Sequence, residues 1–357
     1  MSQVLSSTSA VPAAAGTEIS SGLVQAPLPA PSPHATPATA STAPAQGAAP
    51  ARRAPVPGWR RLAWQATSLL HPAAAARALE RAWFRPPRAP VPPAGLRMLD
   101  RARTEWALVT GQGASRRVRV YRWGHHGPLV LLVHGWGGNA GQWHGVVAGL
   151  LAAGLRVVAF DALSHGASDA GAHGVERSSI VELSRSLLAV AWHVGPVHAV
   201  ISHSAGGPAT ALALREGLPV RAAALICPPA DMSHACRALA FELGFSPAVC
   251  ARMERDSARW LGMPWSALNV PDLGRTREVP PTLVIHDRDD KEVRWEDGAA
   301  IAGAWPGARL MTTQGLGHRR ILLDADVIAR IAAFAGAAHD RLAPSSRERE
   351  DARMRTC

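Results

Sequence analysis

Seven short apolar runs, each bounded by turn-forming residues, alternate with longer segments of helical periodicity over residues 105–340. The central runs are apolar at nearly every position, which is typical of strands buried on both faces of a parallel sheet. This alternation predicts an α/β fold with a mostly parallel central sheet flanked by helices. The predicted strands are Val118–Trp123, Leu129–Val133, Val157–Phe160, Val197–Ile201, Ala222–Ile226, Leu283–His286 and Ala308–Met311. The predicted helices cover about 140–153, 176–193, 205–216, 295–305 and 323–336.

Composition divides the rest of the chain. Residues 1–58 are rich in Ala, Pro, Ser and Thr without a periodic apolar face, which predicts a disordered segment. Residues 59–104 are predicted to form a helical extension followed by a proline-rich linker. Within the 105–340 domain the alternation stops at about 230–279, where a helical pattern of apolar residues predicts a cap inserted over one end of the sheet. The charged residues 341–357 are predicted to form a flexible tail.

Residues 59–85 mix apolar and basic side chains, and Pro72 divides them into two predicted helices. One interpretation is an extension that docks on the main domain through its apolar face. The other is a basic amphipathic anchor at a membrane surface. We favour docking because the apolar residues suit a packed face, and keep peripheral membrane contact through residues 59–85 as the alternative.

The formal net charge of +11 does not by itself indicate a nucleic-acid partner. Lys291 is the single lysine, the arginines are scattered, and few aromatic side chains could stack on bases, so no nucleic-acid binding is expected. No apolar run is long enough to span a bilayer, and no secretory signal pattern is present. The cysteines lack metal-site spacing and are too sparse for a disulfide framework, which predicts a reducing, cytoplasmic location. They are Cys227, Cys236, Cys250 and Cys357.

Four motifs that could carry chemistry occur in a fixed order along the predicted domain. They are His134–Asn139 (HGWGGN), Ser202–Gly207 (SHSAGG), Asp287–Asp290 (DRDD) and Gly315–His318 (GLGH). Each of the first three follows a strand-like run. A serine between a strand and a helix, with small residues two positions to either side, can stand on a sharp turn that exposes its hydroxyl. Ser204 fits this pattern, with Ser202 and Gly206 as the small residues.

The glycine-rich loop at residues 134–138 can turn backbone N–H groups toward a ligand. An acyl-transfer site needs two such donors where the carbonyl oxygen becomes negative, and each lowers the barrier by about 2.7–4 kcal/mol. The N–H groups of Trp136 and Ala205 are the candidates. His134 is interpreted as a structural histidine that holds this loop by hydrogen bonds.

Candidate acids and a candidate base come later in the chain. Asp287, Asp289 and Asp290 follow a predicted strand, where an acid can hold a histidine in the right tautomer. Some of the three are explained equally well as solvated loop charge or as a helix N-terminal acid, and Asp231 is a fallback. His318, which follows two glycines after the last predicted strand, is the candidate base.

Over residues 105–338 the chain resembles the α/β-hydrolase fold. The resemblance is carried by the HGxGG oxyanion loop (134–138), the nucleophile elbow (202–206), the DxxxHGxS loop (161–168) and the terminal GxGH (315–318). Each motif alone is weakly specific, whereas their order along one chain describes one kind of active site.

This resemblance implies a role for each candidate residue. The family's acid usually lies three residues beyond a glycine and three before a hydrophobic residue, and Asp290 has Asp287 and Val293 at those positions. The implied roles are Ser204 as nucleophile, His318 as base, Asp290 as acid, and the backbone of Trp136 and Ala205 as oxyanion donors. Two departures concern loop shape: Ser202 replaces the first elbow glycine, and Leu163-Ser164 stands where Pro-Gly is usual.

The implied function is a serine hydrolase that cleaves a carboxylic ester or related acyl bond through an acyl-enzyme. No metal and no organic cofactor is expected, and the apolar cap suggests a small or medium acyl ester as the substrate. Two alternatives stay open because a fold does not determine a function. One is a non-catalytic interaction protein that works through its N-terminal segments, and the other is an acyltransferase on the same fold.

Overall fold

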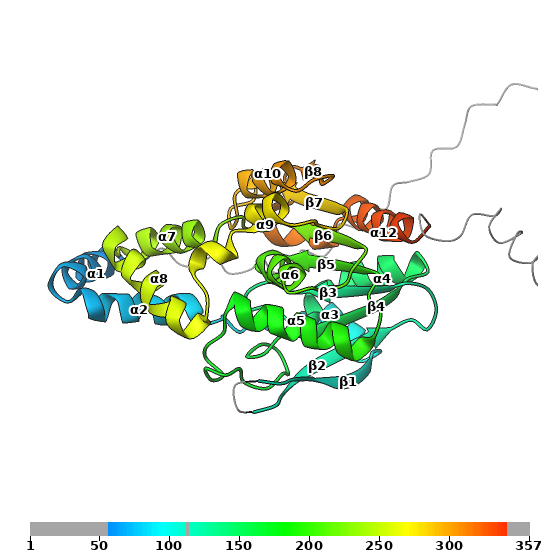
Figure 1. The fold of residues 1–357 in the computed structure, drawn as a ribbon, viewed down its shortest axis with the longest axis horizontal. Helices are drawn as coiled ribbons and strands as arrows, with labels where there is room; N and C mark the ends of the chain where they lie inside the picture. Colours follow the sequence, from blue (N-terminus) through cyan, green and yellow to red (C-terminus); the bar gives the residue numbers. More distant parts are fainter. Residues whose placement is uncertain (1–55, 112–113, 341–357) are drawn as a thin grey trace, which may run out of the picture. The chain divides into compact units, whose positions relative to one another are not determined.

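The structure, a computed structural model, describes residues 56–111 and 114–340 (Figure 1). Residues 1–55, most of the segment predicted to be disordered, lie outside the described residues. Residues 341–357, the predicted flexible tail, also lie outside them. The strands are β1 (Arg103–Val109), β2 (Arg116–Trp123), β3 (Leu129–Val133), β4 (Arg156–Asp161), β5 (Ala199–His203), β6 (Ala222–Ile226), β7 (Thr282–Asp287) and β8 (Arg309–Thr313). The longer helices are α1 (Gly58–Leu70), α2 (Pro72–Phe84), α3 (Pro93–Leu99), α4 (His144–Ala152), α5 (Ile180–Val194), α6 (Gly206–Arg215), α7 (Met232–Leu243), α8 (Pro247–Leu261), α9 (Val270–Thr276), α10 (Trp295–Ala304) and α12 (Ala325–Asp340).

The strands form one eight-stranded sheet in the order β1-β2-β4-β3-β5-β6-β7-β8. β2 pairs antiparallel with β1 and β4, and all other pairs are parallel. At the centre, Leu131 of β3 lies between Val158 of β4 and Val200 of β5. The predicted α/β fold with a mostly parallel sheet is confirmed.

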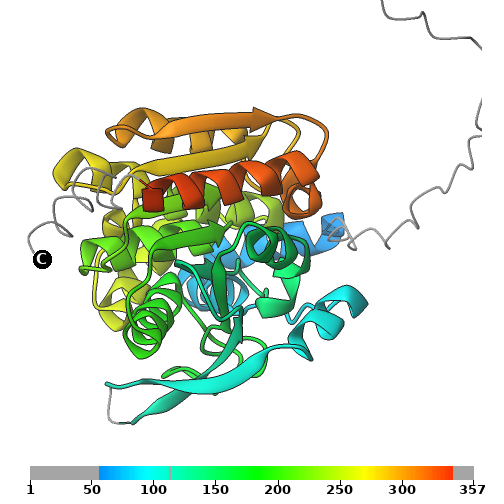
Figure 2. The ribbon, with the colours of Figure 1, turned by 90° about the vertical axis from the view of Figure 1, so that its right-hand side faces the viewer.

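Helices cover both faces of this sheet, which explains the uninterrupted apolar runs. Successive side chains of a strand point to opposite faces. In β3, Leu129, Leu131 and Val133 join the core on the side of α5 and α6, whereas Val130 and Leu132 join the core on the side of α4 and α12. Figure 2 shows α12, in red, lying along its face of the sheet. All five residues of β3 are buried as a result.

The edge strand β1 was not predicted. Its sequence, RTEWALV, contains charged residues at Arg103 and Glu105, and only Ala107 is fully buried. β1 pairs with β2 alone. A strand at a sheet edge needs no continuous apolar pattern, because much of its surface faces solvent.

The predicted cap is present between β6 and β7 and consists of α7, α8 and α9. Asp231 caps α7 by accepting a hydrogen bond from the Ser233 N–H, and Ser246 caps α8 through the Val249 N–H. Gly244 ends α7 in the left-handed conformation. Because β6 and β7 are adjacent and parallel, the cap starts from the carboxyl edge of the sheet.

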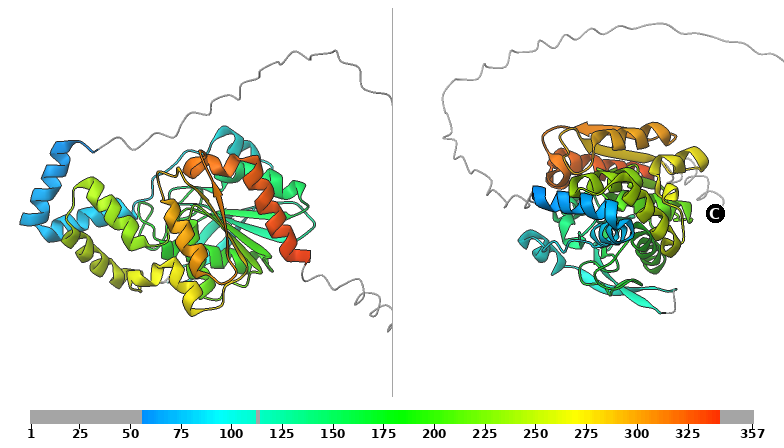
Figure 3. Two further views of the ribbon diagram at one scale, coloured as in Figure 1. Left: turned by 90° about the horizontal axis from the view of Figure 1, so that it is seen from above. Right: turned by 90° about the vertical axis from the view of Figure 1, so that its left-hand side faces the viewer.

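Helices α1 and α2 pack against this cap (Figure 3). The Trp64 ring centroid lies 4.7 Å from that of Phe245, and the Phe84 centroid lies 4.6 Å from that of Trp260. Glu80 accepts a hydrogen bond of 3.0 Å from Trp260 Nε1. The predicted division into two helices at Pro72 is confirmed. Among residues 56–111 and 114–340, no helix has the length and apolar character needed to cross a bilayer.

Candidate active site

Ser204 lies on the turn between β5 and α6. β5 ends at His203 and α6 begins at Gly206, so the chain reverses direction within a very short segment. Ser204 has a φ of +53°, in the left-handed region that favours glycine. Surrounding contacts must hold such a strained residue, and here the Ser204 N–H donates a 2.9 Å hydrogen bond to the Ile226 carbonyl of β6.

Two glycines let neighbouring backbone approach this turn. A Cβ atom on Gly206 would lie 2.6 Å from the Val133 carbonyl oxygen, and one on Gly135 would lie 2.9 Å from Ser204 Cβ. Both distances are shorter than real Cβ contacts. Larger side chains at either position would displace the turn that presents the Ser204 hydroxyl.

The structure brings the candidate nucleophile, base and acid together. His318 Nε2 lies 2.9 Å from Ser204 Oγ, and His318 Nδ1 lies 2.7 Å from Asp290 Oδ2. His318 belongs to the short helix α11 (Gly317–Arg320), and Gly315 and Gly317 have φ values of +82° and +67° in the loop that delivers it. A histidine that bonds a serine hydroxyl and a carboxylate in this way can accept the serine proton.

The Asp290 side chain is fully buried and firmly held. Its Oδ1 accepts hydrogen bonds from the N–H groups of Glu292 (2.8 Å) and Val293 (3.0 Å). Burial acts to raise the pKa of Asp290, but hydrogen bonds from His286 and His318 outweigh it and hold that pKa below its usual range. Asp290 is therefore ionised at neutral pH.

Two side chains behind Asp290 were not singled out from the sequence. His286 Nε2 lies 3.5 Å from Asp290 Oδ2 and 3.1 Å from the Val293 carbonyl oxygen. Cys227 follows β6, and one potential ligand atom from each of Cys227, His286 and Asp290 lies within 4.8 Å of the others. Burial and the Asp290 charge raise the pKa of Cys227, so the thiol stays protonated. His286 lies within reach of both the Asp290 carboxylate and the Val293 carbonyl, and we interpret the cluster as a support for Asp290.

A second unpredicted histidine, His203, supports His318 through the His318 backbone. His203 Nε2 donates a 2.8 Å hydrogen bond to the His318 carbonyl oxygen. Burial, followed by the proximity of His318, lowers the pKa of His203 to about 3. One feature of the sequence could have pointed to His203: it is a polar residue at the end of a mainly apolar strand. The same holds for His286 in β7.

The other candidate carboxylates bind backbone instead of His318. Asp287 Oδ2 accepts hydrogen bonds from Thr313 Oγ1 (2.7 Å) and from the Leu316 N–H (3.0 Å). Asp289 Oδ2 accepts one from the Gly315 N–H (3.1 Å). These two acids anchor the loop that carries His318, and Asp231 caps α7 as described above.

The loop after β3 places Trp136 near the turn that carries Ser204, because the preceding residue, Gly135, lies close to Ser204. His134 Nδ1 donates to the Gly135 carbonyl (2.7 Å), and its Nε2 accepts from the Ala162 N–H (2.9 Å). Burial lowers the pKa of His134 to about 4, so the ring is neutral and structural. In the part of the chain that the structure describes, the N–H groups of Trp136 and Ala205 donate no hydrogen bond to a protein acceptor.

A model of the alpha/beta hydrolase family matches residues 130–331, more than half of the chain. This chain belongs to the alpha/beta hydrolase family. Among curated proteins, it is similar to the probable esterase PIR7A of rice (Oryza sativa, subspecies indica and japonica), with 39% identity over 114 residues. That match covers 30% of this chain and 42% of the rice proteins, so the chain spans less than half the length of these relatives.

A solved structure supports the family's fold. Rv0554 from Mycobacterium tuberculosis superposes with a TM-score of 0.51 at 18% identity, over 65% of this chain and 99% of that one. At this identity the likeness concerns the fold alone.

The two departures from the alpha/beta hydrolase motifs differ in their contacts: among the described residues the Ser202 hydroxyl has no hydrogen-bond partner, whereas the Ser164 hydroxyl has one. Ser202, in place of the first elbow glycine, is completely buried in β5, between Val133 and Leu225. Ser164, in the position where glycine is usual, has a φ of +63°. Its hydroxyl donates to the Gly174 carbonyl (3.0 Å), which helps to hold this conformation.

Proposed function

We propose that this chain is a serine hydrolase that cleaves carboxylic esters or related acyl bonds. The observation that carries the proposal is the continuous hydrogen-bonded series from Ser204 Oγ through His318 to Asp290, at 2.9 and 2.7 Å. The name of the rice relatives supports an ester substrate.

In the proposed reaction, Ser204 Oγ attacks the acyl carbon while its proton moves to His318 Nε2. The carbonyl oxygen becomes negative and accepts hydrogen bonds from the Trp136 and Ala205 N–H groups. The intermediate then expels the alcohol, which takes the proton from His318 and leaves an acyl-enzyme. A water molecule loses a proton to His318 and attacks the acyl carbon, which releases the acid and restores the Ser204 hydroxyl. Ionised Asp290 stabilises the imidazolium in both halves.

The proposed substrate is a small or medium acyl ester. Several apolar cap residues that suggested a pocket wall, such as Phe245, Met253 and Trp265, are buried in the packing between the cap and α1–α2. Because these side chains stabilise the cap, they do not define the size of an acyl pocket. The acyl chain length that the enzyme accepts is therefore the quantity to measure.

The test is hydrolysis of p-nitrophenyl esters from acetate to laurate. Ser204→Ala should lower kcat/KM by at least about 10⁴-fold. Ser202→Ala, a matched change two residues away at a buried serine, should keep most of the activity. A serine-directed phosphonate should add one adduct, on the peptide that contains Ser204.

Other outcomes separate the alternatives. Full turnover by Ser204→Ala would contradict the proposal. No turnover of any ester, together with no phosphonate adduct, would favour the non-catalytic alternative. Transfer to an added alcohol in preference to water would favour the acyltransferase.

A further inference from the structure

Helix α1 presents an apolar face to solvent. At about 100° per residue, its large exposed side chains fall within an arc of about 100°. They are Trp59 (68% exposed), Leu62 (67%), Leu69 (82%) and Leu70 (73%), and we call them the α1 stripe. Phe241 of α7 is 73% exposed, and its carbonyl accepts a hydrogen bond from Arg61 (3.4 Å), which places it beside α1. Contiguous apolar surface of this kind usually marks an interaction site.

The α1 stripe is not the face that attaches α1 to the cap. Trp64 stacks against Phe245 with ring centroids 4.7 Å apart. Ser68 is buried and accepts a hydrogen bond from the Ser246 N–H at 3.5 Å. Both residues lie on the opposite side of α1, so the helix is anchored by one face and leaves the other uncovered.

The charges beside the α1 stripe are basic. The Arg60 guanidinium lies 5.4 Å from the Trp59 ring centroid, and that of Arg61 lies 5.7 Å from the Phe241 centroid. α1 contains no acid, and the one acid of α2, Glu80, is paired with Arg177. Glu242 of α7, which directly follows Phe241 in the chain, is an exposed acid.

We infer that the α1 stripe docks on an anionic lipid bilayer. The apolar side chains would enter the boundary between headgroups and acyl chains, while Arg60, which lies over the Trp59 ring, binds a lipid phosphate. Trp59 suits this interface because its ring is apolar and its N–H is polar. A second copy of the chain fits less well, since a symmetric interface would bring the arginines of both copies together.

Lipid binding is measured without reference to catalysis, so this inference and the proposed function fail separately. The experiment is co-sedimentation of the full chain with phosphatidylcholine vesicles that contain 30% phosphatidylglycerol, or none. The chain should bind the anionic vesicles, and added salt should weaken the binding. Leu62→Asp/Leu69→Asp should lower the partition coefficient by about 100-fold, and Arg60→Ala by about fivefold.

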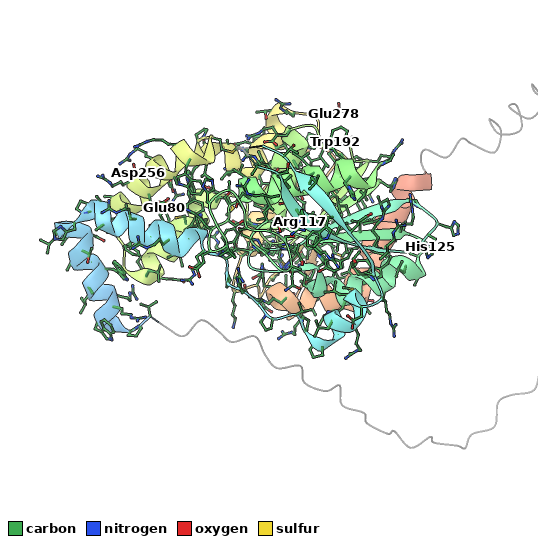
Figure 4. All side chains as sticks on the ribbon, turned by 90° about the horizontal axis from the view of Figure 1, so that it is seen from below. Glu80, Arg117, His125, Trp192, Asp256 and Glu278 are labelled. Atoms are coloured by element: carbon green, nitrogen blue, oxygen red, sulfur yellow. The ribbon has the colours of Figure 1, made fainter. Side chains whose placement is uncertain are left out.

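A matched control tests whether any exposed apolar residue would act alike. Trp192 is 73% exposed on α5, and Figure 4 shows it well separated from Glu80 of α2. Trp192→Asp should bind vesicles as the unmodified chain does. Equal binding by Leu62→Asp/Leu69→Asp would overturn the inference. Absence of binding to the anionic vesicles would also overturn it. In that case, a dimer seen by sedimentation velocity and lost in Leu62→Asp/Leu69→Asp would identify a second copy of the chain as the occupant.

Discussion

The candidate active site and the cap are stabilised by different kinds of contact. Around Ser204, His318 and Asp290, buried polar groups form directional hydrogen bonds at the ends of strands. Between the cap and helices α1 and α2, aromatic rings from two distant parts of the chain pack together, and one face of α1 remains exposed. Hydrogen bonds hold a group in one orientation, whereas apolar packing tolerates adjustment. Groups that need precise orientation therefore lie at the sheet edge, whereas the exposed apolar surface lies on α1, beside the cap.

The largest expected effect on activity comes from removing the Asp290 carboxylate from the hydrogen-bonded series Ser204–His318–Asp290. Asp290→Asn should lower kcat/KM for a p-nitrophenyl ester by about 10⁴-fold, because the amide favours the wrong tautomer of His318. Asp289→Asn, at an exposed neighbour that bonds only backbone, is the control and should retain activity within about tenfold. Similar losses in both variants would contradict the assignment of Asp290.

Acid should destabilise the active-site edge through its buried histidines. Burial lowers the pKa of His134 to about 4 and those of His165 and His203 to about 3. Between pH 6.5 and these values the unfolded chain binds more protons than the folded chain, so stability is full above pH 6.5 and falls as pH is lowered. At pH 5 each histidine should cost about 2 kcal/mol of unfolding free energy.

Urea unfolding at pH 7 and pH 5 measures this loss. His165→Gln should reduce the difference between the two pH values by about 2 kcal/mol. The exposed His125, on the opposite side of the molecule from the cap (Figure 4), provides the control, and His125→Gln should leave the difference unchanged. An unchanged difference in His165→Gln would refute the histidine explanation.

A smaller effect should follow from removing the support behind Asp290. His286→Ala should lower kcat by about tenfold with little change in KM, because His286 orients the acid and does not contact substrate. His286→Gln, which keeps a donor, should recover part of the loss. A change confined to KM, or no recovery by glutamine, would argue against a positioning role.

The smallest effect is expected in the cap. Glu80→Gln should lower the unfolding free energy by about 1 kcal/mol, because Glu80 of α2 joins Trp260 of the cap helix α8 and Arg177 of the loop before α5. The exposed Arg85–Glu176 pair offers a matched control, and Glu176→Gln should have no measurable effect. Ester hydrolysis should be unchanged in both variants; a loss of kcat in Glu80→Gln would show that the cap also positions the reacting groups.

The apolar runs predicted the central strands well, because a strand that is buried on both faces is apolar at nearly every position. Boundaries moved where polar residues enter the sheet, as for Ser202 and His203 in β5. The edge strand β1 had no such signal. The order of the motifs singled out Ser204 and His318 as candidates, and the resemblance to alpha/beta hydrolases singled out Asp290 among three acids. His203, His286 and Cys227 look like ordinary polar residues in a chain with fifteen histidines.

The alternation of strands and helices, the order of the four motifs and the division of residues 59–85 at Pro72 could be read from the amino-acid sequence alone. These features depend on neighbours within a few residues. Only the tertiary structure decided that His286 lies behind Asp290, that α1 and α2 pack on the cap, and that the α1 stripe faces solvent. Such contacts join residues far apart in the chain, and a local apolar pattern has the same form whether its face is covered or exposed.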